Sequence, residues 1–444
     1  MSTRKEVRHA RRASEEAQRY LDQLRAEHQA RLGTRLGTLP APVDEANQNY
    51  LVDYILGKMF SPEQVDQYPQ LRAQAKRQLA SVVQDRDGAL SEELGRKQEN
   101  IEKSAARRIT GGDLSHLRPL VGYLETGQLN AVTMRVPGRS GAYLVTFEDQ
   151  LSKFAGKLSK AVAWAIPYDG ETFEMGVDAV TERIEANPDV VAYFAAIVVT
   201  YAVTGSLNQT DDPQPMRLGY HVFADRILSN SLDYFVLGHE YAHILHGHLE
   251  TTATRKGVLP ATEAEALAYS WQQELDADRL GMGMAINAYI EYEHEDEEAS
   301  MFRDISGGFL GIGLFFGALD VMDRAVALLE TGDENARQLG SHPPSDMRMQ
   351  HLRGHLPKLG GDQPAGVKMV QEALKVAEVQ QEIIRLLWER TRPILLDLHR
   401  RGVPAARKWR PIPKETGDEP ALALPSAPAP KHARRPGWRW GHSG

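Results

Sequence analysis

Cysteine is absent from the 444 residues of the chain, and the chain carries no excess of positive charge. Without thiols there are no disulfides and no thiolate metal sites, so any metal ion must be bound by His, Asp or Glu. The formal charge of −8 argues against a protein that binds nucleic acid through bulk positive charge, and we expect no nucleic-acid partner. A hydrophobic content of 42% and a charged content of 25% are typical of a globular protein.

The chain also lacks a hydrophobic run that is long enough to span a bilayer. The longest apolar run, residues 190–203, is shorter than the roughly 20 residues that a span requires, and the apolar stretch around residue 314 is short and rich in glycine. Residues 1–24 are charged throughout and lack the apolar segment of a secretory signal. We therefore expect two buried core helices, no stable membrane insertion and a cytoplasmic protein. Membrane association through residues 190–203 is the alternative.

Composition changes along the chain in a way that indicates several regions. Residues 1–110 are rich in Arg, Glu, Gln and Ala, which favours helix. Two segments with β-type alternation flank the turn-like GRSG at residues 138–141 and predict a β-hairpin over about 130–148. From Val403 onward the density of proline predicts a disordered Pro/Arg-rich tail.

The spacing of apolar residues predicts a mainly α protein of the α+β class. The expected helices cover about 148–165, 188–204, 229–249, 262–290, 300–330, 345–357 and 366–402. We divide the chain into a helical N-terminal region (1–110), a central domain (111–360), a C-terminal helix (361–402) and the tail (403–444).

The stretch HEYAHILHGH, which begins at His239, has the spacing of a metal site. Two histidines four apart lie one turn from each other on the same helix face, so the imidazoles of His239 and His243 can converge on one tetrahedral ion. Glu240 can reach the open position of that ion as a general base. Asn230 or Ser231 is the predicted N-cap of the helix. The pattern HExxH is short and also arises by chance, so a third ligand decides between a metal site and an ordinary helix.

A candidate third ligand lies 31 residues after His243 in the stretch WQQELDADRLG. Glu274 and Asp278 are four apart on one face of a second helix, while Asp276 lies off that face. Glu274 can supply a carboxylate oxygen to zinc, and Asp278 can accept the N–H of a ligand histidine and fix its tautomer. Two ordinary acids on a helix surface are the alternative.

A third stretch, SHPPSDMRMQHL, places His342 directly before two prolines, which prevent a helix until about Ser345. A histidine in such a loop could donate a hydrogen bond to the oxyanion of a tetrahedral intermediate. Arg348 could bind a substrate carbonyl, or it could hold the loop through an acid. On spacing alone, an ordinary surface histidine is the default interpretation.

The three stretches in this order resemble the HtpX-like and CAAX-prenyl-protease family of zinc metallopeptidases, over roughly residues 225–355. The resemblance implies a gluzincin-like core, with His239, His243 and Glu274 as ligands of one Zn²⁺ per chain and Glu240 as the general base. It also implies that Asp278 supports a ligand histidine and that His342 and Arg348 lie around the substrate. Members of this family often have a further histidine five residues after the second histidine ligand, and His248 stands at that position.

The other two histidines of HEYAHILHGH can have different roles. His246 lies one turn beyond His243 and can line the cleft, whereas His248 follows Gly247 at the predicted helix end, where it can bond free carbonyls.

The predicted function is therefore a zinc-dependent endopeptidase that acts on a protein or peptide. A substrate strand would lie along the edge of the 130–148 hairpin. Two alternatives remain open. Family members are typically membrane-embedded or exported, whereas we expect neither a span nor a signal in this chain. The protein could therefore be a soluble regulatory or phage-exclusion-type zinc peptidase that acts on one specific cytoplasmic protein. It could also be a non-catalytic interaction protein with a structural metal site.

Overall fold

The computed structural model describes residues 4–32, 86–107, 114, 117–124, 129–137, 141–167, 176–207, 219–250, 263–292, 305–336, 342–361 and 363–406. Most of these residues lie in helices, and three short strands form one sheet, so the predicted mainly α fold is confirmed. The elements are α1 (Arg4–Leu32), α5 (Arg86–Ala105), β1 (Leu120–Leu124), β2 (Ala131–Arg135), β3 (Tyr143–Glu148), α6 (Asp149–Ala165), α7 (Val177–Ala186), α8 (Pro188–Thr204), α9 (Gly219–Leu245), the 3₁₀ helix η4 (His248–Glu250), α11 (Glu263–Tyr292), α12 (Ile305–Thr331), α13 (Ser345–His355), α14 (Pro357–Gly360) and α15 (Pro364–Arg400).

The sheet has the strand order β1-β3-β2. Strands β2 and β3 pair antiparallel with Thr133 opposite Val145, which confirms the predicted hairpin. Strand β1 pairs parallel with β3 and was not predicted, because its five residues include Gly122 and no turn signal joins it to its partner. Since β3 lies in the middle, β2 forms one edge of the described sheet.

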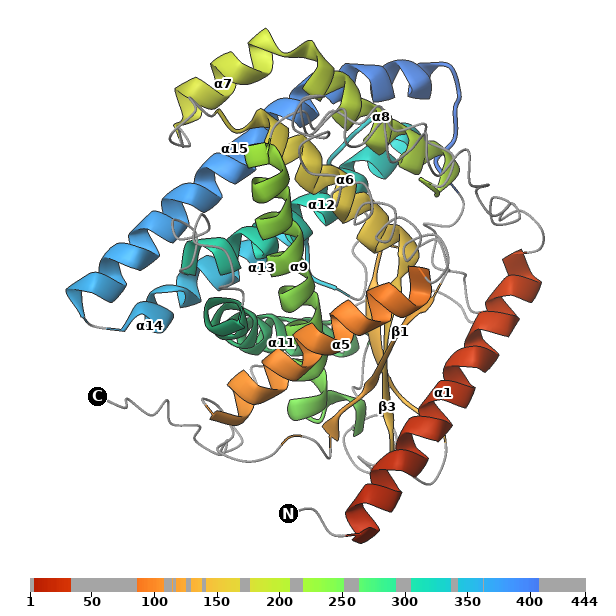
Figure 1. The fold of residues 1–444 in the computed structure, drawn as a ribbon. Helices are drawn as coiled ribbons and strands as arrows, with labels where there is room; N and C mark the ends of the chain where they lie inside the picture. Colours follow the sequence, from red (N-terminus) through yellow and green to blue (C-terminus); the bar gives the residue numbers. More distant parts are fainter. Residues whose placement is uncertain are drawn as a thin grey trace, which may run out of the picture.

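Helix α1 and the helical core cover opposite faces of the sheet (Figure 1). Leu21 of α1 packs with Val136 and Leu144 on one face. The absence of a side chain at Gly122 permits this contact, because a Cβ atom there would lie 2.4 Å from a Leu21 methyl carbon. On the other face, Ala131 of β2 and neighbouring strand residues belong to the main core. The sheet is therefore held from both sides.

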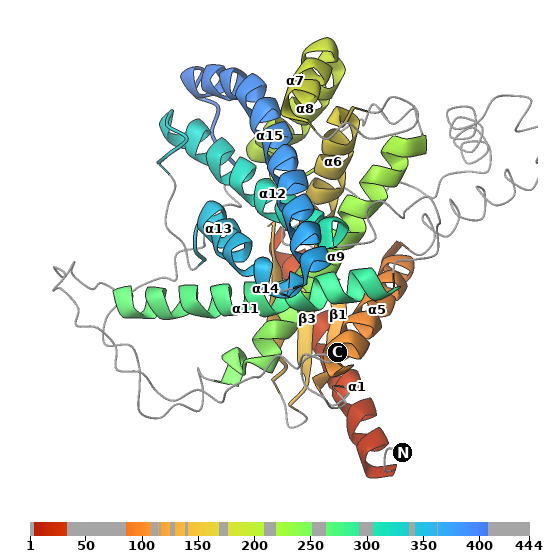
Figure 2. The same cartoon turned by 90° about the vertical axis from the view of Figure 1, so that its left-hand side faces the viewer.

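Helix α9 lies at the centre of the fold and contacts α5, α6, α11, α12 and strand β2. Figures 1 and 2 show α11 running across α9. The predicted N-cap was wrong, because α9 begins at Gly219 and passes through Asn230 and Ser231. Both polar side chains are satisfied inside the fold. The Ser231 hydroxyl donates to the Ile227 carbonyl at 2.8 Å, and the Asn230 side chain accepts a hydrogen bond from the buried Lys97 ammonium at 3.0 Å.

Glycine allows α11 and α12 to approach α9 closely. A Cβ atom on Gly281 of α11 would lie 2.6 Å from the backbone nitrogen of His239. A Cβ atom on Gly311 of α12 would lie 2.1 Å from the backbone nitrogen of Leu232. The Gly281 contact sets the distance between α9 and α11, the two helices that carry the predicted ligands, and the Gly311 contact packs α12 against α9.

Two apolar helices correspond to the apolar stretches of the sequence. Helix α12 is long and apolar enough to cross a membrane, but 78% of its most apolar window is buried inside the protein, as in a core helix. Helix α8 covers the run 190–203 and buries Phe194 and Val198, and it is bent by 87° relative to α7. The described residues thus contain one apolar helix of spanning length, or up to two if the bent pair is counted as one span.

The C-terminal helix α15 packs against α12, α8 and α7, and α5 of the N-terminal region packs against α9 and α11. Both therefore share one core with the central segment. The backbone N–H of Ala406 donates to the Ala202 carbonyl at 2.8 Å, and Ala405 is buried. The prediction that a disordered tail starts at residue 403 is therefore wrong for residues 403–406, which pack on the fold. The rest of the predicted tail, residues 407–444, lies outside the described part of the chain. The domain division at residues 110 and 360 stays a prediction.

Candidate metal centre

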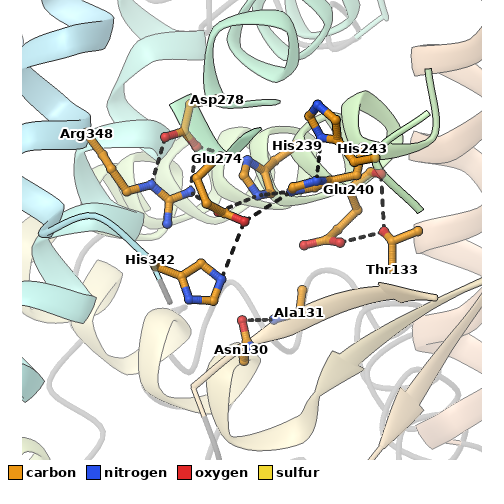
Figure 3. A network of polar contacts seen from close by, with 11 residues as sticks. Asn130, Ala131, Thr133, His239, Glu240, His243, Glu274, Asp278, His342 and Arg348 are labelled. Carbon is orange, nitrogen blue, oxygen red and sulfur yellow. Dashed lines mark hydrogen bonds and ion pairs between the residues drawn. The ribbon is translucent and has the colours of Figure 1, made fainter. Parts of the chain in front are cut away.

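The two central helices bring His239, His243 and Glu274 together (Figure 3). One ligand atom from each residue lies within 4.8 Å of the others. The Nε2 atoms of the two histidines are 3.1 Å apart. The Nε2 atoms of His239 and His243 each lie 3.5 Å from a carboxylate oxygen of Glu274.

These separations fit a tetrahedral zinc ion. Bonds of about 2.0–2.1 Å to each ligand place neighbouring ligand atoms roughly 3.3 Å apart at tetrahedral angles. The observed separations of 3.1 and 3.5 Å lie on either side of this value. Two imidazoles and one carboxylate are the ligand types that zinc accepts, and they leave one position for a water or a substrate. The residues present therefore fit a catalytic type of zinc site.

Each histidine uses its other ring nitrogen for a contact that orients the ring. His239 Nδ1 lies 2.9 Å from Asp278 Oδ1, and His243 Nδ1 lies 2.9 Å from His248 Nδ1. Such contacts fix the tautomer and leave Nε2 for a metal ion. The structure thus places His248 against a candidate ligand. The end of α9 is closed by the backbone instead, with the Gly247 N–H donating to the Ile244 carbonyl at 3.0 Å and Gly247 at a φ of +66°.

His246 lies beside His248. Its side chain is exposed, and its ring stacks on the ring of His248. The group of residues that could hold a metal ion in the described part of the chain is His239, His243 and Glu274, without His246.

Arg348 and Asp278 form a buried bidentate pair behind the ligands. Arg348 Nε donates to Asp278 Oδ2 at 2.7 Å, and Arg348 Nη2 donates to Oδ1 at 2.6 Å. Arg348 is 3% exposed and Asp278 is 0% exposed. The guanidinium also lies 3.3 Å from Glu274 and stacks over Phe316. Of the two roles predicted for Arg348, this position favours holding an acid over binding a substrate carbonyl.

His342 lies on the more open side of the site. Its Nε2 is 3.6 Å from Glu274 Oε1, and its side chain is 49% exposed. The two prolines follow, and α13 begins at Ser345 as predicted. His342 therefore reaches the ligands from a loop, whereas Arg348 reaches them from the helix after that loop (Figure 3).

Glu240 is buried beside the ligands and is held by a residue that the motifs did not indicate. Thr133 Oγ1 on β2 donates to Glu240 Oε2 at 2.5 Å and lies 3.2 Å from the Glu240 carbonyl. Asn130, just before the same strand, accepts the N–H of Ala131 on its side-chain oxygen at 3.0 Å. The predicted proximity of the hairpin to the site was the only signal in the sequence that could have pointed to these residues.

The charges of the site favour a cation. Three carboxyl groups, from Glu240, Glu274 and Asp278, share the site with one guanidinium, which contacts Asp278 and Glu274, so neutral imidazoles leave an excess of negative charge that a divalent ion would balance. Burial disfavours a charged His239, but its contacts with the carboxylates of Asp278 and Glu274 outweigh burial and raise its pKa to about 10. Burial also opposes ionisation of Glu274, but the contact with His239 lowers its pKa. In the metal-free protein a proton on His239 thus supplies part of the missing positive charge.

Burial has the opposite effect on two other groups. It raises the pKa of the Glu240 carboxyl above its ordinary value, against the effect of nearby His239 and of the Thr133 hydrogen bond. It lowers the pKa of His243 to about 3, so this imidazole stays neutral and can bind a metal ion through Nε2. A buried carboxyl with a raised pKa beside a metal site is suited to accept and return a proton.

A mainly helical fold with two histidines from one helix and a glutamate from a second is consistent with an α-rich metallopeptidase. Residues 226–356 match the model of Peptidase family M48, which supports the M48 metallopeptidase family and a metal-dependent peptidase activity. The matched segment runs from within α9 to just past α13 and contains the predicted ligands. No curated protein and no solved structure matches the chain. The resemblance to the HtpX-like and CAAX-prenyl-protease group stays a prediction.

Proposed function

We propose that the protein is a zinc-dependent endopeptidase in which Glu240 is the general base. The arrangement of His239, His243 and Glu274 around one point carries this proposal, together with the buried Glu240 beside them. Glu240 is not needed as a ligand, and a purely structural metal site has no use for such a group. This argues against a non-catalytic interaction protein.

The protein's residues can perform the reaction in a simple order. When bound, zinc would lower the pKa of a water molecule and polarise the peptide carbonyl. The Glu240 carboxylate accepts a proton from the attacking water and then passes it to the nitrogen of the leaving amine. His342 donates a hydrogen bond to the carbonyl oxygen as negative charge develops on it. Asp278 and His248 keep the two ligand imidazoles in place.

The edge of β2 that no other described strand pairs with is suited to hold an extended peptide. The Glu148 N–H donates to the Asn130 carbonyl, and the Val136 N–H donates to the Ala142 carbonyl. Because residues in an antiparallel pair alternate between bonding to the partner and pointing away from it, the even-numbered residues of β2 bond to β3. The backbone N–H and carbonyl of Thr133 therefore point away from β3, to the edge of β2 that no other described strand pairs with, and the N–H also interacts with the Glu240 carboxyl. A substrate strand that pairs there would run past Glu240 and the metal site, as in β-strand addition to other proteins.

The substrate that we propose is a protein or peptide, and we propose that it is cleaved in the cytoplasm. Action on one specific cytoplasmic protein, as in a regulatory peptidase, stays an alternative for the biological role. Fractionation of a cell extract would test the location. Recovery of the protein only with the membrane pellet would contradict a cytoplasmic enzyme.

The proposed activity can be tested with Glu240→Gln. Purified protein should contain one zinc ion per chain by elemental analysis, and it should cleave members of a mixed peptide library, with products identified by mass spectrometry. Glu240→Gln should keep the zinc and lose cleavage by at least about 100-fold, because general base catalysis contributes roughly 10²–10⁴-fold. Glu334→Gln, which changes a carboxylate that bonds to Trp388 and Arg392 and not to a candidate ligand, is the matched control and should cleave normally. Cleavage by protein freed of zinc would contradict the proposal.

A further inference from the structure

We propose that Thr133 is a positioning residue that orients the Glu240 carboxylate and connects it to the strand on which the substrate docks. This inference rests on the proposed function. It concerns a side chain outside the segment that matches the family model, which begins at residue 226.

The contact itself is close and buried. Thr133 and Glu240 are both less than a tenth exposed, and the hydroxyl oxygen lies 2.5 Å from Glu240 Oε2. Within the described part of the chain, Thr133 is the only side chain that hydrogen-bonds to Glu240. Because its hydroxyl occupies Oε2, the other carboxylate oxygen is left to accept the proton of the attacking water.

The alternation of β2 allows one residue to serve two purposes. In a strand, successive side chains point to opposite faces, so Thr133 faces α9 together with Ala131, while Val132 and Met134 face the other way. The backbone polar groups of Thr133 lie in the plane of the sheet and point to the edge that is unpaired in the described part of the chain, where the N–H also interacts with the Glu240 carboxyl. A peptide that pairs with Thr133 is therefore placed in register with the carboxylate that its side chain holds.

No neighbouring side chain on β2 can replace this contact. Ala131 shares the face but has only a methyl group. The hydroxyl of Thr146 on β3 belongs to a different contact, since it donates to the Val132 carbonyl at 3.3 Å. Thr146 therefore contributes to the sheet and not to Glu240, which makes it a useful control.

The test compares Thr133→Val, Thr133→Ser and Thr146→Val. Valine has the shape of threonine without the hydroxyl, and serine keeps the hydroxyl. Steady-state rates would be measured on a quenched fluorescent peptide chosen from the library members that the zinc-loaded wild-type protein cleaves. We expect Thr133→Val to lower kcat about 10-fold or more, as for loss of a hydrogen bond to a charged group, with KM within about threefold. Thr133→Ser and Thr146→Val should stay within about threefold of the wild-type kcat.

Two further measurements separate positioning from damage to the site. Zinc content and the visible absorption of the cobalt-substituted protein should be the same in Thr133→Val and wild type, because the ligands are untouched. In a Glu240→Asp background the shorter carboxylate no longer reaches the hydroxyl, so Thr133→Val should then change kcat by less than about twofold. Such non-additivity is not expected of a residue that only supports the fold.

Three outcomes would overturn the inference. One is a kcat for Thr133→Val equal to that of Thr146→Val. Another is an equal loss in Thr133→Ser and Thr133→Val, which would show that the hydroxyl is not the cause. A third is full additivity with Glu240→Asp. Absence of cleavage by the zinc-loaded wild-type protein is a different result, because it contradicts the proposed function before any Thr133 variant is compared.

Discussion

Arg348 offers a quantitative test of how the site is held together. Its guanidinium makes two short hydrogen bonds to Asp278, and both groups are almost fully buried. Arg348→Met keeps much of the side-chain volume and removes the charge. The variant leaves Asp278 and the neighbouring Glu274 buried with only the His239 imidazolium as a cationic neighbour.

The size of the effect follows from burial. Removing one partner of a buried ion pair costs about 3–5 kcal/mol, whereas an exposed pair contributes about 1 kcal/mol or less. Arg385 and Glu382 on α15 form an equally short bidentate pair, with distances of 2.8 and 2.6 Å, but the Arg385 side chain is 51% exposed. Arg385→Met is therefore a control with the same chemistry and a different environment.

The measurement is urea unfolding of the metal-free proteins, followed by circular dichroism. Arg348→Met should lower the free energy of unfolding by about 3–5 kcal/mol, which raises the unfolding constant more than roughly 100-fold. Arg385→Met should change it by about 1 kcal/mol or less. Equal losses in the two variants, with equal dependence on urea, would refute the argument that burial makes the Arg348 pair important.

Further predictions concern the imidazoles and the contact between α9 and α11. His248→Ala should weaken zinc binding about 10–100-fold in competition with a chelating dye, while His246→Ala should leave it within about twofold; equal effects would contradict the role given to His248. In the metal-free protein the raised pKa of His239 contributes stability that is complete below about pH 6.5 and is lost as the pH rises through about 10, so the free energy of unfolding should fall over this window. Zinc should abolish that pH dependence. A free energy of unfolding that does not change with pH in the absence of zinc would contradict the prediction. Gly281→Ala should destabilise the protein by about 1–3 kcal/mol and weaken zinc binding, because its Cβ atom would meet the backbone of His239. Gly156→Ala, which has open space around it, should stabilise α6 by up to about 1 kcal/mol. Thermal melts with and without zinc compare the two variants.

The predictions that succeeded depend on local spacing. His239 and His243 are four apart, and 3.6 residues per turn place them on one face in any α-helix. The same rule predicted that Glu274 and Asp278 share a face, and two prolines predicted the start of α13 at Ser345. The β2–β3 hairpin was predictable because only residues 136–142, which include the turn-like GRSG, separate its strands along the chain.

The predictions that failed concern signals that the surrounding structure overrides. Asn230 and Ser231 are favourable N-caps in isolation, but they lie inside α9, where Lys97 and a backbone carbonyl satisfy their side chains. Strand β1 was missed because its partner β3 is not its neighbour along the chain. Residues 403–406 looked like the start of a tail, yet they pack on α8 through the bond between Ala406 and Ala202.

The sequence by itself determined which residue types could bind a metal and which of them share a helix face, because cysteine is absent and helix geometry is fixed by the backbone. Only the tertiary structure decided that Arg348 pairs with Asp278 and that Thr133 bonds to Glu240. Each of these contacts joins elements separated by 70 or more positions along the chain. Their geometry depends on how closely α9, α11, α13 and β2 pack, which no single segment specifies.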